Sequence, residues 1–175
     1  MDFSQTHFAL FDLPQSYALD RDKLDAAYRE LQNAVHPDRF AAHSEAEQRM
    51  AMQRATQVNE AYQTLKDPVS RGVYLLRLQG IGALDASNTK MAPAFLVQQM
   101  EWREAIEDAG AAKDMAALDA LTDDLRTAHR RIEAQLAELV DRAHDYAAAS
   151  EAVRQLRFMD KLLAEVGDVY EELES

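Results

Sequence analysis

The sequence contains no cysteine among its 175 residues. Disulfide bonds, thiolate metal sites and cysteine nucleophiles are therefore excluded together, and a chain without cysteine suits the reducing cytoplasm. The N-terminus shows no basic and apolar pattern of the kind found in signal peptides. No apolar run approaches the roughly 20 residues that a membrane span requires. We therefore expect a cytoplasmic protein without a membrane partner.

Glycine and proline are also scarce, with five and four residues, and runs of β-branched residues are few. The residues that favour helices, Ala, Leu, Glu, Gln and Arg, are abundant instead. Apolar residues recur at helical spacing over most of the chain. The sequence therefore predicts an all-α fold.

Clusters of lysine and arginine are missing as well. The chain has 31 acidic and 19 basic residues and a formal net charge of −12. A nucleic-acid surface needs clustered cations that displace the counterions of the phosphate backbone, so we expect no nucleic-acid partner. The negative field instead suits a basic surface on another protein.

Two long helices with matched apolar faces are predicted in the first third of the chain, one on each side of Pro37. The first begins after Asp20, which is a good N-cap residue, and its apolar stripe is Leu24, Tyr28, Leu31 and Val35. The second begins at Ser44, where Ser44 and Glu47 have capping-box spacing, and it ends at Asp67-Pro68. We expect the two helices to pack as an antiparallel hairpin.

A domain boundary is predicted near residue 80, where glycine, serine and asparagine gather. Three helical stretches joined by short connections follow, which is typical of a three-helix bundle with antiparallel neighbours. We expect an L-shaped arrangement of two domains, and a monomer. The predicted parts are a helical hairpin domain over 1–79, a linker over 80–90 and a three-helix bundle over 91–175.

The turn His36-Pro37-Asp38 joins the two helices of the hairpin. Pro37 fixes its own φ and restrains His36, and Asp38 is expected to fold back onto backbone donors in an Asx-type turn. His36 and Asp38 would then be displayed on a stiff tip. An ordinary polar loop, in which proline merely stops a helix, is the alternative.

The first helix of the bundle carries two apolar stripes rather than one. Phe95, Trp102, Ile106 and Ala109 form a core stripe, whereas Leu96, Val97 and Met100 fall on nearly the opposite side, among carboxylates. In the last helix, Phe158 falls outside the core face that is centred on Leu156 and Leu163. These outward residues predict an apolar patch with an acidic border. Alternatively, Leu96 and Met100 pack against the first domain or fill the wide end of the bundle.

The N-terminal pattern resembles the J-domain family. The resemblance lies in the helix, His-Pro-Asp, helix order, in Phe40 and in the string Asn59-Glu-Ala-Tyr62-x-x-Leu65, and it covers roughly residues 5–78. Within this family the chain is similar over nearly its whole length to the HscB co-chaperones of iron–sulfur cluster assembly. The strings His36–Phe40, Tyr74–Leu78 and Val153–Leu162 carry that narrower resemblance.

The resemblance implies a co-chaperone with two partners. The J-domain would stimulate ATP hydrolysis by HscA, a DnaK-like chaperone, and the bundle would bind and deliver IscU, the cluster scaffold. The implied chaperone-binding residues are His36, Pro37, Asp38, Arg39, Arg29 and Lys23. The implied scaffold-binding residues are Leu96, Val97, Met100, Glu101, Glu104, Asp108 and Phe158. The usual family pattern has Met and Glu where this chain has Val97 and Asp108. The flank of the helix that begins after Asp20 carries more acidic residues than the family's basic pattern.

Three other functions compete with this one. An enzyme is disfavoured, because no phosphate-binding glycine loop, nucleophile elbow or metal-ligand spacing is present, and we expect no catalytic residue, metal or cofactor. A general J-protein for misfolded clients would share the N-terminal half, but such proteins usually add glycine-rich or cysteine-rich regions. A purely structural helical adaptor would not need His36.

Overall fold

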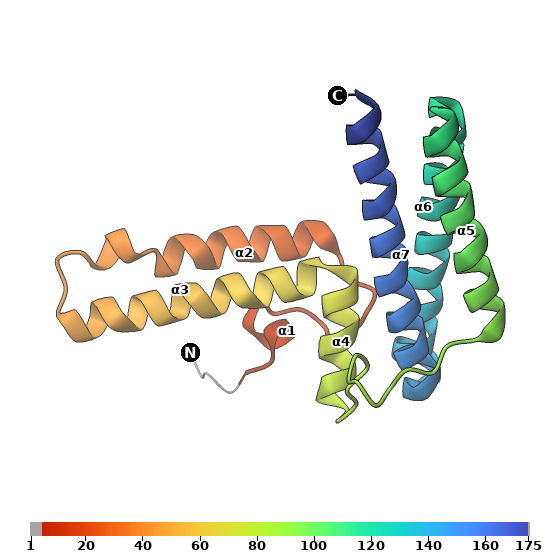
Figure 1. The fold of residues 1–175 in the computed structure, drawn as a ribbon. Helices are drawn as coiled ribbons and strands as arrows, with labels where there is room; N and C mark the ends of the chain where they lie inside the picture. The colour runs from red at the N-terminus through yellow and green to blue at the C-terminus, as the bar shows by residue number, and fades with distance from the viewer. Residues whose placement is uncertain (1–4, 175) are drawn as a thin grey trace. The chain divides into compact units, whose positions relative to one another are not determined.

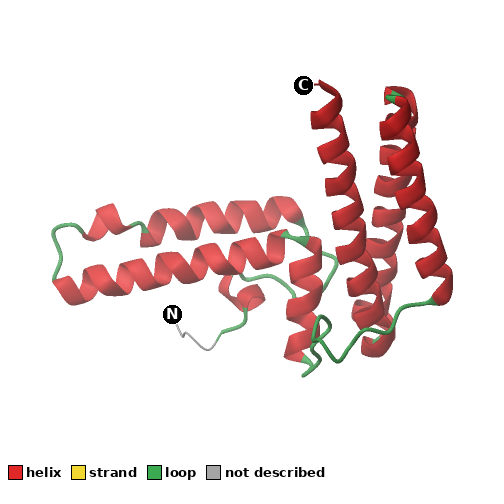
Figure 2. Cartoon of the chain, viewed as in Figure 1, coloured by secondary structure: helices red, strands yellow, loops and turns green. Residues whose placement is uncertain are grey.

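The computed structural model describes residues 5–174, apart from the side chain of Pro37. The described part consists of helices and their connections, without a strand, as Figure 2 shows. The chain divides into two compact units, Met1–Leu75 and Leu76–Ser175. The all-α prediction is confirmed. Among the described residues, no helix is long and apolar enough to cross a lipid bilayer.

The first unit is built on a hairpin of two long helices (Figure 1). Helix α2 (Arg21–Val35) starts after an Asp20 side chain that accepts a hydrogen bond from the backbone of Lys23. Helix α3 (Glu45–Lys66) starts with the predicted capping box, in which Ser44 and Glu47 each bond the other's backbone. A short 3₁₀ turn, η1 (Pro37–Phe40), lies between them. Leu24, Val58 and Leu65 are fully buried, which confirms the predicted apolar faces.

Two tyrosines, one on each long helix, join α2 to α3. The rings of Tyr28 and Tyr62 stack with centroids 3.9 Å apart, and the Tyr28 hydroxyl donates to Asn59 Oδ1 at 3.0 Å. The Tyr62 hydroxyl donates across the hairpin to Asp25 Oδ1 at 3.1 Å. Each ring therefore contributes apolar contact and fixes a polar partner on the other helix.

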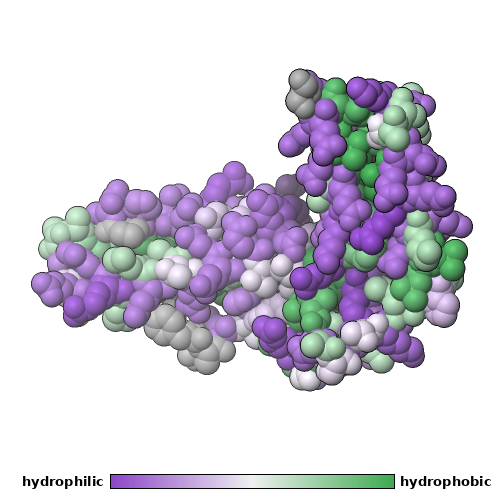
Figure 3. Space-filling view, viewed as in Figure 1, coloured by the Kyte–Doolittle hydropathy of each residue, from purple (hydrophilic) through white to green (hydrophobic). Residues whose placement is uncertain are grey.

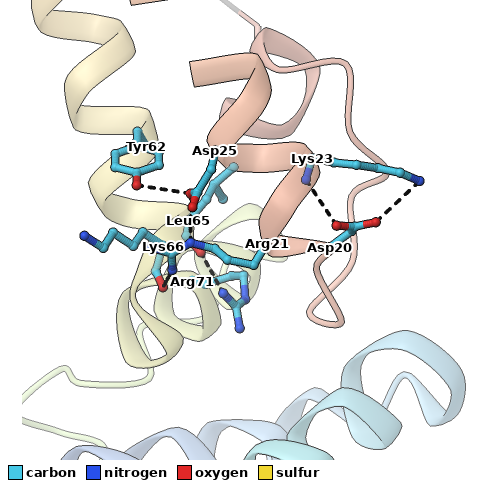
Figure 4. A network of polar contacts seen from close by, with 8 residues as sticks. All are labelled: Asp20, Arg21, Lys23, Asp25, Tyr62, Leu65, Lys66 and Arg71. Atoms are coloured by element: carbon cyan, nitrogen blue, oxygen red, sulfur yellow. Dashed lines mark hydrogen bonds and ion pairs between the residues drawn. The ribbon is translucent and has the colours of Figure 1, made fainter. Parts of the chain in front are cut away.

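A polar network closes the end of the hairpin that lies opposite the turn (Figure 4). Arg21 binds the Asp25 carboxylate at 2.9 Å and also donates to the backbone carbonyl of Lys66 at 3.1 Å. Desolvation opposes ionisation of Asp25, but hydrogen bonds from Arg21 and Tyr62 and the charges of Arg21 and Arg29 outweigh it and lower the pKa of Asp25. The i, i+4 spacing of Arg21 and Asp25 was the only sign of this network in the sequence.

Residues near the beginning and the end of the first unit are in contact with one another. In helix α1 (His7–Leu10), the Phe8 side chain is 1% exposed. The backbone N–H of His7 donates to the Tyr74 hydroxyl at 3.0 Å, and the two rings stack with centroids 4.2 Å apart. Tyr74 belongs to helix α4 (Pro68–Leu78), which begins after an Asp67 side chain that accepts a hydrogen bond from the backbone N–H of Ser70.

The second unit is a three-helix bundle made of α5 (Pro93–Ala112), α6 (Met115–Ala137) and α7 (Tyr146–Glu174). Consecutive helices run antiparallel, as expected, and α5 therefore runs parallel to α7 (Figure 1). Lys113 turns the chain between α5 and α6 with a φ of 52°. Helix α6 ends at Ala137, where the chain widens into a π-helical turn, η2 (Glu138–Ala143). His144, with a φ of 52°, ends that turn.

The segment before α5, predicted as a linker, is bound to α7 within the second unit. Arg154 donates to the backbone carbonyls of Lys90 and Ala83 and to the Ser150 hydroxyl, at distances of 2.7 to 3.2 Å. Ala83 and Ser150 are buried. The arginine thereby fixes the chain before Pro93 to α7.

His129 ties α6 to α7. Its Nε2 lies 3.0 Å from Asp160 on α7, and its Nδ1 lies 2.9 Å from Glu133 on its own helix. Hydrogen bonds to Asp160 and Glu133 raise the pKa of His129 to about 9, against the opposing effect of desolvation. The imidazolium thus binds a carboxylate on each side of its ring.

This arrangement predicts a pH-dependent stability. A pKa raised from 6.5 to about 9 on folding stabilises the protein fully below pH 6.5, and the contribution is lost as the pH rises through 9. Urea unfolding at pH 6 and at pH 9.5 should show a loss of about 1–2 kcal/mol in the unsubstituted protein, since both carboxylates are partly exposed.

The matched variant is His129→Gln, which keeps a hydrogen-bonding side chain but cannot be protonated. It should be less stable than the unsubstituted protein at pH 6 and equal to it near pH 9.5. Parallel pH profiles for the two proteins would contradict the role of His129.

Candidate functional site

The turn between α2 and η1 presents His36 at the free end of the hairpin. Helix α2 ends at Val35 because His36, which precedes proline, adopts an extended conformation with φ −58° and ψ 128°. The Nδ1 atom of His36 then accepts a hydrogen bond from the backbone N–H of Asp38 at 3.3 Å. His36 is therefore the N-cap of η1, and its imidazole is half exposed.

The predicted role of Asp38 in this turn is wrong. Asp38 was expected to bond backbone donors, but the His36 ring supplies the cap and the Asp38 side chain is 90% exposed. The reason is the 3₁₀ geometry: the N–H of Asp38 belongs to the first turn and points back towards residue 36. The carboxylate lies 3.6 Å from His36 Nδ1. The side chain of Pro37 lies outside the described residues.

The predicted basic residues do not form one surface. Arg29 and Asn33 are four residues apart on one flank of α2, and Arg39 donates to the Asn33 carbonyl at 3.3 Å. Arg29 and Arg39 therefore share that flank with the tip. Lys23 is six residues from Arg29, roughly 120° away around the helix, and it pairs with Asp20 at 3.6 Å.

Helix α5 of the second unit carries the predicted apolar patch. Leu96, Val97 and Met100 are 41%, 57% and 69% exposed, so they do not fill the bundle. Ile106 and Ala109 are buried on the opposite side, as expected. The predicted acidic border, Glu101, Glu104 and Asp108, is exposed on the same helix. Figure 3 shows apolar surface between hydrophilic atoms where Figure 1 places α5.

Phe158 of α7 lies beside this helix, but it is half-buried rather than exposed. The Phe95 ring meets it edge-on, with centroids 6.1 Å apart, and the Arg103 guanidinium lies over it, 5.0 Å from its centroid. Sequence reasoning missed Arg103 because the contact joins residues that are 55 positions apart. Helices α5 and α7, which carry the predicted scaffold-binding residues, nevertheless meet at the Phe158 ring.

Charge is distributed unevenly between the units. Residues 76–175 contain 20 acidic and 11 basic side chains, whereas residues 1–75 contain 11 and eight. The second unit therefore carries most of the net negative charge. A partner that docks on the apolar patch would meet an acidic surround, which favours a basic partner surface.

Two family models match the chain, one to each unit. A model described as DnaJ domain matches residues 6–74. A second, described as HSCB C-terminal oligomerisation domain, matches residues 91–167. The matched ranges agree with the hairpin unit and with the helical bundle.

Curated relatives and solved structures resemble the chain over its whole length. A "Co-chaperone protein HscB homolog" of Burkholderia thailandensis is 55% identical over 174 residues, and the match covers 99% of both chains. The structure of chaperone HscB from Vibrio cholerae matches with a TM-score of 0.85 and 41% identity, covering 97% of this chain and 99% of that one. Human co-chaperone HscB matches with a TM-score of 0.87 and 29% identity, covering 95% and 83%.

The exposed position of His36 predicts that the tip matters little for stability. His36→Ala removes one acceptor from a solvent-accessible N–H, and the free energy of unfolding should fall by less than about 1 kcal/mol. Leu24→Ala, on the same hairpin but fully buried, should cost about 2–5 kcal/mol. Urea denaturation of both variants measures the contrast, and equal losses would mean that His36 is a structural cap rather than a displayed group.

Proposed function

The chain belongs to the HscB family of J-domain co-chaperones, and on that premise we propose that it couples a chaperone of the HscA type to the iron–sulfur scaffold IscU. The first unit stimulates ATP hydrolysis by this DnaK-like chaperone. The second unit binds the scaffold and delivers it. The co-chaperone itself has no catalytic residue and works as a monomer in the cytoplasm.

One observation supports the proposal: each unit exposes its own group of the predicted contact residues. The first is the tip, where His36 is half exposed and the Asp38 carboxylate is 90% exposed. The second is the apolar patch of α5, bordered by carboxylates. Burying an apolar side chain contributes roughly 1.5–3 kcal/mol, so Leu96, Val97 and Met100 are sufficient for a transient complex.

The electrostatics of both surfaces support partners of different chemistry. The tip combines an imidazole and a carboxylate with the guanidinium groups of Arg29 and Arg39 on one flank, which suits an acidic surface on the chaperone. The α5 patch has only carboxylates among its predicted charged contacts, Glu101, Glu104 and Asp108, which suits a basic surface on the scaffold. Because the tip favours an acidic partner surface and the α5 patch favours a basic one, each partner binds its own unit.

Separate sites predict separable losses. His36→Gln should abolish stimulation of the chaperone ATPase and leave scaffold binding unchanged, because the ring lies on the first unit. Met100→Ala combined with Phe158→Ala should weaken scaffold binding about 100-fold or more and leave stimulation in the absence of scaffold unchanged. Single-turnover ATP hydrolysis and scaffold titration measure the two activities.

The control for this pair is Met52→Ala, which removes another exposed methionine, on α3 and not among the residues of either proposed surface. It should leave both activities intact. Loss of both activities in both folded variants would rule out the two-site proposal. Equal binding of an unfolded client and of the scaffold would favour a general J-protein instead.

The flank of α2 allows the chaperone contact to be tested more finely. Arg29→Ala should reduce ATPase stimulation about three- to tenfold, because Arg29 lies on the same flank as Arg39 and the tip. Lys23→Ala should have a smaller effect, since Lys23 lies on another side of the helix. Stimulation measured against chaperone concentration at two salt concentrations would test this order, and a larger effect of Lys23→Ala would contradict the placement of the docking surface.

A further inference from the structure

The Phe158 ring is held from two sides by groups on α5. Phe95 approaches it edge-on, and the guanidinium of Arg103 lies over it. The guanidinium is itself fixed by Glu165, whose Oε1 lies 3.1 Å from Arg103 Nη2. Phe158 and Glu165 are seven residues apart, so they lie on the same face of α7, two turns from one another. Arg103 therefore contacts both Phe158 and Glu165 on that face of α7.

Arg103 also belongs to the row that carries the apolar patch. Leu96, Met100 and Arg103 are spaced i, i+4 and i+7, so they lie on one face of α5. The arginine thus stands between the patch of α5 and the ring on α7. Its side chain is 48% exposed and that of Glu165 is 40% exposed, so the pair lies at the surface that a partner would cover.

A surface ion pair of this kind adds little to folding stability by itself. Its geometry has a different consequence, because a planar guanidinium held over an aromatic ring restricts the orientations of both groups. A partner that binds a ring already held in one orientation loses less side-chain entropy than one that must order it. The contact therefore bears on binding more than on folding.

We propose that Arg103 is a positioning residue, which holds the Phe158 ring in the orientation that the scaffold binds, with Glu165 fixing the guanidinium. The inference rests on the proposed function, since it assigns a role within the scaffold-binding surface. Arg103 acts through Phe158 and not through a bond to the scaffold. Removing the guanidinium leaves the ring in place but free to rotate, so the scaffold must order it on binding.

A double-mutant cycle in the full chain tests this role. Scaffold binding is titrated with the unsubstituted protein, Arg103→Ala, Phe158→Leu and the double variant. Arg103→Ala should raise the dissociation constant about three- to fivefold in the presence of Phe158. In the Phe158→Leu background the same change should have less than about a twofold effect, because the group that Arg103 positions is missing.

Two further measurements separate positioning from a general structural effect. The Phe158 ring signals in the NMR spectrum of the free protein should shift in Arg103→Ala and in Glu165→Gln, with no change in the unfolding midpoint. Arg142→Ala, which breaks another exposed arginine–glutamate pair, that of Arg142 with Glu138 at 3.4 Å, should alter neither the ring signals nor scaffold binding.

The outcomes are distinguishable. Tighter binding by Arg103→Ala would show that the guanidinium is a cover that the partner must displace, and would overturn the proposal. An equal weakening in both backgrounds would show a direct contact of Arg103 with the scaffold, and would also overturn it. Unchanged binding by Phe158→Leu would overturn the scaffold site itself, together with any role of Arg103 in it.

Discussion

The packing of α2 against α3 is the interaction on which the rest of the first unit depends. A turn of a few residues has no rigidity of its own, so the direction in which His36 and Asp38 point is set by the two helices that hold the turn. The stacked Tyr28 and Tyr62 rings fix the distance between those helices, and the bond from Tyr62 to Asp25 fixes their register. Because the side chains that meet are polar as well as apolar, one alignment of the hairpin is favoured over its neighbours.

The sequence predicted features that arise within one element or between adjacent ones. The Ser44–Glu47 capping box, the end of α2 before Pro37 and the end of α3 at Asp67-Pro68 all depend on local backbone chemistry, and each is confirmed. The helical period likewise placed the exposed Leu96, Val97 and Met100 correctly. The roles of the predicted contact residues stay a prediction, because exposure alone does not identify a partner.

The features that were missed or wrong depend on contacts between distant elements or on unusual local geometry. Three such contacts join residues that are 31 to 71 positions apart. They are those of Arg103 with Phe158, of Arg154 with Ala83 and of His129 with Asp160. Helical periodicity shows which side of a helix faces inward, but not which residue of another helix lies opposite. The capping of Asp38 by His36 was missed for another reason, since a histidine rarely caps a turn and the pattern favours aspartate in that role.

The contact between His7 and Tyr74 has a consequence for folding during synthesis. The two residues that close the first unit are 67 positions apart, near its beginning and its end. A nascent chain therefore cannot complete this unit until α4 has left the ribosome, although α2 and α3 can pair earlier. The second unit is closed in the same way, because Arg154 of α7 binds the backbone carbonyl of Ala83, 71 residues earlier. Synthesis from the N-terminus thus completes each unit only after most of its length is available, although neighbouring helices within a unit can pair earlier.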